Sequence, residues 1–80
     1  MFLEIITPER KLYSGNVNLV RVPGAKGSFE ILTKHAPIIS MLIKGEIKIV
    51  DTTEKTTSLE ITGGVLESKD DKIIVLAETA

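Results

Sequence analysis

The chain has no cysteine, and its only aromatic residues are Phe2, Tyr13 and Phe29 among 80 residues. Without cysteine there is neither a disulfide to hold the fold nor a thiolate ligand for structural zinc, and the absence fits a cytoplasmic protein. A chain of this length forms one domain, residues 1–80, and buries only about 60–65% of its unfolded surface. Its core must come from the plentiful aliphatic side chains, whose β-branched character favours a sheet protein.

Long apolar runs and an excess of basic residues are also missing. The longest mainly apolar run, IISMLI at residues 38–43, is of strand length and far below the ~20 residues that span a bilayer. The formal net charge of −1, with single lysines mixed among glutamates, argues against nucleic-acid binding. Residues 2–7 already alternate like a strand, so we expect neither a signal nor a transit peptide.

What the chain does contain is a series of short alternating segments separated by turn signals, and no sustained helical period. This pattern predicts an all-β domain, either a sandwich or a barrel. The expected strands are residues 2–7, 11–13, 17–22, 28–32, 38–43, 47–51, 56–62, 65–68 and 73–77. The expected turns are residues 14–16, 44–46, 51–55 and 69–72, with a bulge or corner at Gly63-Gly64. The inward-facing residues are predicted to be Leu3, Ile5, Val20, Val22, Ile47, Ile49, Leu59, Ile61, Ile73 and Val75.

The most unusual segment is residues 21–37, RVPGAKGSFEILTKHAP, which interrupts the alternation twice. Pro23-Gly24 is typical of a tight turn, because proline presets φ and glycine tolerates a positive φ. Pro37 donates no backbone hydrogen bond, so a central strand position is unfavourable there. Such a segment is either a plain connection or a contact surface on a rigid scaffold.

Catalytic chemistry has weak support in these residues. His35 is the single histidine, and Glu30 is the nearest carboxylate in sequence, but no nucleophile accompanies them. We interpret His35 as a structural or interface residue and predict no catalytic residue.

Ligand-binding signals are weak as well. The glycines at 24, 27, 63 and 64 do not match either phosphate-binding motif. Asp70-Asp71, flanked by lysines, is interpreted as a solvated turn rather than a metal site, as is the polar stretch of residues 51–58. We therefore predict no metal and no cofactor.

The order of the central motifs nevertheless resembles a known family, the epsilon subunit of the F-type ATP synthase. The resemblance covers the whole chain. It is carried by Val20, Val22-Pro23-Gly24, Gly27, Ile31-Leu32, His35-Ala36-Pro37, Leu42, Gly45-Glu46-Ile47, Gly63-Gly64-Val65-Leu66-Glu67 and Val75-Leu76-Ala77-Glu78-Thr79-Ala80, with Leu3 to Ile6 and Tyr13-Ser14-Gly15 at the start.

The resemblance implies a flattened sandwich of two roughly five-stranded sheets and a non-catalytic place in the rotor's central stalk. There the domain would link the gamma subunit to the membrane c-ring while proton or sodium flow drives ATP synthesis. It implies a bacterial protein, peripheral on the cytoplasmic face of the inner membrane, and a monomer when isolated. The c-ring contact would be Lys26, Gly27, Ser28, Phe29 and Glu30. The gamma contact would be His35, Ala36, Pro37 and Ile38.

This sequence departs from the family pattern at some positions, and these differences limit which family properties are expected of it. Many relatives have glycine at the position of Glu30 and Pro-Gly at Thr33-Lys34. Relatives usually continue past the position of Ala80 into two helices, to which inhibition and nucleotide binding are assigned. We therefore expect the 80-residue chain to bind no ATP directly.

Two alternatives to this function stay open. One is a free-standing β-sandwich that binds a peptide or carbohydrate, and the other is a small enzyme using His35 and Glu30. Phe29 is either a core residue or an exposed anchor at the partner surface.

Overall fold

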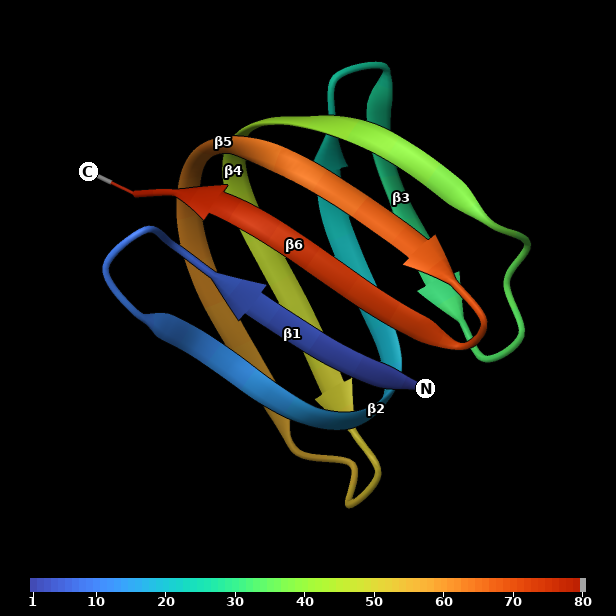
Figure 1. Cartoon of the computed structure of the whole chain (residues 1–80). Coiled ribbons are helices and arrows are strands. Elements are labelled where there is room, and N and C mark those ends of the chain that lie inside the picture. The colour runs from blue at the N-terminus through green and yellow to red at the C-terminus, as the bar shows by residue number, and fades with distance from the viewer. Residues whose placement is uncertain (80) are drawn as a thin grey trace.

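A computed structural model describes residues 1–79, and this part of the chain contains six β-strands and no helix (Figure 1). The strands are β1 (Phe2–Ile6), β2 (Lys11–Gly24), β3 (Gly27–Leu32), β4 (Ile38–Asp51), β5 (Thr56–Lys69) and β6 (Lys72–Glu78). The prediction of an all-β fold is therefore confirmed.

The strands form one sheet in the order β1-β6-β5-β4-β2-β3, and an additional β1–β2 pairing closes it on itself. Most neighbours are antiparallel, but β1 and β6 run parallel. The result is a closed, barrel-like arrangement instead of two separate five-stranded sheets (Figure 1).

The difference arises because three strands are longer than predicted. The expected turns at 14–16 and 44–46 and the break at Gly63-Gly64 lie inside β2, β4 and β5, which continue through them. The first half of β2 pairs with β1, and its second half pairs with β3 and β4. Glycine inside a strand often marks a bend, so these sequence signals indicate where a continuous strand curves.

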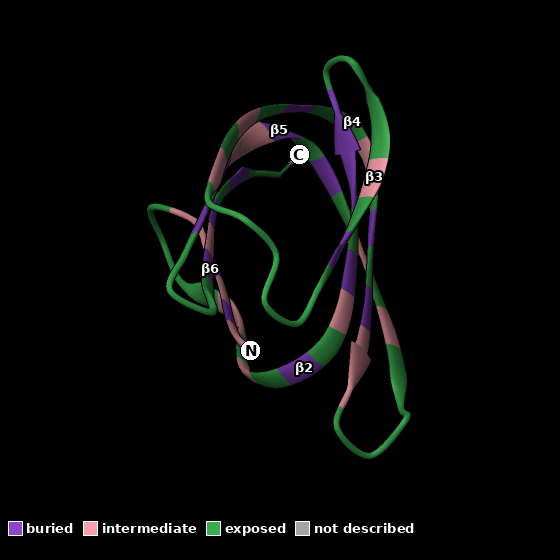
Figure 2. Cartoon of the chain, turned by 90° about the vertical axis from the view of Figure 1, so that its right-hand side faces the viewer, coloured by how far each residue is buried: buried purple, intermediate pink, exposed green. Residues whose placement is uncertain are grey.

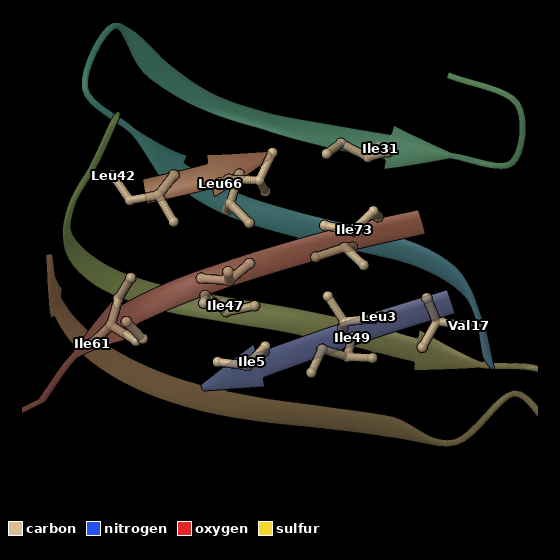
Figure 3. Close-up of a cluster of buried hydrophobic side chains, with 14 residues drawn as sticks. Leu3, Ile5, Val17, Ile31, Leu42, Ile47, Ile49, Ile61, Leu66 and Ile73 are labelled. Carbon is tan, nitrogen blue, oxygen red and sulfur yellow. The ribbon is translucent and has the colours of Figure 1, made fainter. Parts of the chain in front are cut away.

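Buried aliphatic side chains fill the space enclosed by the sheet (Figure 3). Nine of the ten predicted core residues are buried, and Leu59 is half-buried. The core also contains Val17, Ile31, Leu42, Leu66 and Ala77. Val17 and Val20 are three positions apart, which in a regular strand would place them on opposite faces, yet both are buried. The reason is that the β2–β4 register shifts between Val17 and Leu19, and such a shift changes which face a side chain occupies.

The predicted hairpins at 51–55 and 69–72 are present. In the first, Asp51 Oδ1 accepts hydrogen bonds from Thr53 Oγ1 at 2.7 Å, Thr53 N at 2.8 Å and Lys55 N at 3.0 Å. These bonds, led by the Thr53 hydroxyl, hold the pKa of Asp51 below its ordinary value because they favour the carboxylate. The second hairpin turns at Asp70 and Asp71, with φ of 53° and 61°. Figure 2 shows that the connections are largely exposed, whereas buried residues recur along the strands.

Candidate functional site

The first predicted contact segment is the tip of the β2–β3 hairpin, where Ala25 and Lys26 form a two-residue turn between Gly24 and Gly27. A Cβ on Gly24 would lie 2.7 Å from the Gly27 carbonyl oxygen and 2.8 Å from the Phe29 ring, so only glycine fits here. The Ala25 amide donates to the Met41 carbonyl at 2.9 Å, which ties the tip to β4.

Phe29 is neither fully buried in the core nor fully exposed. Its ring lies against the Gly24 backbone and packs on the core, while the residue stays partly accessible. Lys26, Gly27 and Ser28 are exposed at the tip. Glu30 is also exposed and lies opposite Arg21 on β2.

A surface depression of about 550 Å³ joins the hairpin tip to the start of β4. Its lining includes Lys26, Gly27, Ser28 and Phe29 from one predicted contact group and Ile38 from the other. The structure thus brings these parts of the two groups together. Glu30, His35, Ala36 and Pro37 lie outside this depression.

The second predicted segment, residues 33–37, is the exposed connection from β3 to β4. His35 Nδ1–H donates to the Ala36 carbonyl at 2.7 Å, and the His35 backbone amide donates to the Leu32 carbonyl at 3.1 Å. The Lys34 amide donates to Asp71 Oδ1 at 3.3 Å. Through these contacts His35 helps to hold the local conformation of the connection. Within residues 1–79, no group of three side chains that could bind a metal ion lies together.

An apolar surface that sequence reasoning missed begins directly after this connection. We name the exposed side chains of Ile39, Met41, Ile43 and Leu76 the apolar face; their exposed fractions are 72%, 62%, 52% and 54%. Cross-strand pairing places Met41 beside Val65 and Val65 beside Leu76, so the face extends over β4, β5 and β6. A second depression, of about 480 Å³, is lined by Met41 and Leu76 of this face and reaches Ile6 of β1.

The run at 38–43, apolar except for Ser40, was the signal for this face. In an antiparallel sheet with one solvated side, apolar and polar residues alternate, so apolar residues at both alternating positions indicate that both sides of the strand carry apolar surface. Only Leu42 of this run is buried in the core. The outward residues form a contiguous exposed apolar surface, a feature that often marks an interaction site.

The shifted titratable groups lie elsewhere on the described chain. Glu4 has a lowered pKa, chiefly because Lys11 Nζ lies 2.8 Å from its Oε2. Burial raises the pKa of Tyr13, and the charge of Asp51 adds to the effect. Within residues 1–79, no helix has the length and apolar character to cross a membrane.

Comparison with known proteins agrees with the all-β class of the fold. A family model described as "ATP synthase, Delta/Epsilon chain, beta-sandwich domain" matches residues 1–80. Relatives named "ATP synthase epsilon chain" include one from Dehalococcoides mccartyi, 42% identical over 98% of this chain, and one from Brevibacillus brevis, 35% identical over the whole chain. The chain spans 55% and 61% of the lengths of these two relatives, respectively.

A solved structure shares the fold at low sequence identity. It is a chain from "Cryo-EM structure of Euglena gracilis mitochondrial ATP synthase, OSCP/F1/c-ring in rotational state 1", with a TM-score of 0.87 and 16% identity. The match covers 94% of this chain and 48% of that one. The fold, the family match over residues 1–80 and the identities to the bacterial relatives lead to one conclusion: the chain belongs to the family of ATP synthase delta/epsilon chain β-sandwich domains.

Proposed function

We propose that this chain is a non-catalytic part of the central stalk of a rotary ATP synthase, where it links the gamma subunit to the c-ring. The observation that carries the proposal is the family match over residues 1–80. The relatives' shared name, ATP synthase epsilon chain, supports it. In this role the domain is peripheral to a bacterial inner membrane and supports the coupling of ion flow to ATP synthesis.

The surface chemistry suits a rigid connector with two different contacts. The hairpin tip offers Lys26 and Ser28, which are exposed and polar, and it is the proposed c-ring contact together with Gly27, Phe29 and Glu30. Polar and charged rim contacts govern specificity and association rate more than affinity.

The proposed gamma contact comprises His35, Ala36, Pro37 and Ile38 and continues onto the apolar face. Ile39 is next to Ile38 in sequence and is the most exposed of the large apolar residues. Burying its side chain and that of Met41 against a partner removes apolar area from water, which contributes about 25 cal/mol per Å² before the costs of association. The apolar face therefore supplies affinity that the polar tip does not.

The test is binding of the purified chain to purified gamma subunit and to detergent-solubilised c-ring, measured by biolayer interferometry. The double variant Ile39→Ser, Met41→Ser is expected to weaken gamma binding at least about tenfold with little change in melting temperature, because both side chains are already exposed. Lys26→Glu is expected to alter the salt dependence of c-ring binding. Lys55→Ser, in the exposed β4–β5 hairpin loop, is the control.

Two outcomes would contradict the proposal. One is a wild-type chain that binds neither gamma nor the c-ring, which would favour a free-standing peptide- or carbohydrate-binding module. The other is a double variant that binds gamma as tightly as the Lys55→Ser control does.

A further inference from the structure

A single carboxylate joins three segments of the chain that are distant in sequence. Asp71, in the β5–β6 turn, accepts the Lys34 backbone N–H at Oδ1, 3.3 Å away. Its Oδ2 lies 3.5 Å from the amine of Met1, and its backbone carbonyl accepts the Phe2 N–H at 3.0 Å. Figure 1 shows the β3–β4 connection passing beside the turn between β5 and β6. Asp71 thus bridges the start of β1 and the β3–β4 connection.

The two residues joined by this hydrogen bond, Lys34 and Asp71, both have a left-handed backbone conformation. Lys34 has φ of 66° and Asp71 has φ of 61°. A side chain with a Cβ seldom adopts this conformation and keeps it only where surrounding contacts hold it. At Lys34 the neighbouring constraints are its own bond to Asp71 and the His35 amide bond to the Leu32 carbonyl. The Asp71 carboxylate is therefore one of the few groups that fix this connection.

We propose that Asp71 is a positioning residue that holds the connection of residues 33–37 in the shape its partner binds. This inference rests on the proposed function, since the partner is the gamma subunit. Residues 33–37 are all exposed, so hydrogen bonds, not burial, determine their course. A connection ordered in advance loses less conformational freedom on binding, and that difference appears as affinity.

The sequence of the turn supplies a matched control. Asp70 has φ of 53°, nearly the same as Asp71, and it is likewise exposed. Replacing either with glycine relieves the same backbone strain, but only Asp71→Gly removes the carboxylate that bonds to Lys34. Asp71→Asn keeps an acceptor oxygen and a residue that tolerates this conformation. The three variants therefore separate the effect of losing the Asp71 carboxylate from the effect of changing the backbone conformation of the turn.

The experiment combines amide hydrogen exchange by NMR with affinity for purified gamma subunit. Asp71→Gly is expected to speed exchange at the Lys34 amide by roughly tenfold and to weaken gamma binding by about three- to tenfold. Asp70→Gly should leave both unchanged, and Asp71→Asn should restore most of both. Melting temperatures confirm that each variant is folded.

Three results overturn the proposal. One is equal Lys34 exchange in Asp71→Gly and Asp70→Gly, and another is faster exchange in Asp71→Gly without weaker gamma binding. The third is a wild-type chain that does not bind gamma. That result refutes the proposed function itself, whereas the exchange data separately decide whether Asp71 holds the connection.

Discussion

Replacement of Gly64 by alanine should destabilise the domain more than any other single-methyl addition to its glycines. Gly64 lies within β5 at φ 157°, and it pairs with Ala77 of β6. A Cβ built there would lie 2.5 Å from the Leu76 carbonyl oxygen and 3.3 Å from the Ala77 Cα. Both are backbone atoms of a paired strand, so neither is free to move aside.

The expected magnitude follows from two costs. A backbone conformation reserved for glycine costs about 1–3 kcal/mol for another residue, and overpacking a well-filled site costs about 1–3 kcal/mol. Together they remove about 2–6 kcal/mol from a free energy of unfolding that, for a domain of this size, is roughly 4–12 kcal/mol. The melting temperature should fall by at least about 10 °C.

The assay is thermal and urea unfolding followed by circular dichroism, with Gly63→Ala as the control. The nearest atom to a Cβ on Gly63 is Glu78 Oε1 at 3.3 Å, the mobile end of a flexible side chain. That variant should stay within about 1 kcal/mol of the wild type. If the two alanine variants melted within about 2 °C of each other, the close approach of β5 and β6 would not be what requires glycine at position 64.

Two further predictions concern pH and nucleotide. The pKa of Asp51 is lowered from 3.8 in the folded state, so its stabilising contribution is present above about pH 4 and is lost as pH falls through the folded pKa. The difference in melting temperature between the wild type and Asp51→Ala should therefore shrink between pH 5 and pH 2, and a constant difference would contradict this. The chain should also bind no MgATP in calorimetric titration, because it carries no phosphate-cradling motif. Micromolar binding would contradict that expectation.

The sequence predicted the core well wherever a strand alternates regularly. Leu3 and Ile5, or Ile47 and Ile49, are two residues apart and face the same side, and all four are buried. It failed where a strand bends, since a glycine in a curving strand has the same local signature as a glycine in a turn. Gly45 illustrates this: β4 passes through it, and a Cβ there would meet the Pro23 ring at 2.9 Å. That packing depends on a partner 22 positions away, which no local pattern reveals.

The candidate site was also predictable only in part, because some of its features follow from local sequence signals and others from contacts between distant residues. The exposed tip at Lys26 and the exposed connection at His35 follow from proline and glycine signals. The outward orientation of Ile39 and Met41 depends on the pairing of β4 with β5, and the Asp71 bond to Lys34 joins residues 37 positions apart. Asp70-Asp71 was interpreted as a solvated turn. It is exposed, but that interpretation missed the contact through which Asp71 reaches the β3–β4 connection.

The parallel pairing of β1 with β6 determines when the fold can be completed during synthesis. β1 leaves the ribosome first and β6 last, yet β1 lies between β2 and β6 in the closed sheet. Until residues 72–78 emerge, one edge of β1 and one edge of β5 stay unpaired. Exposed edges of this kind are templates for pairing with other chains, and pairings between distant segments form slowly. The nascent domain therefore exposes two strand edges that can pair with other chains until β6 has emerged.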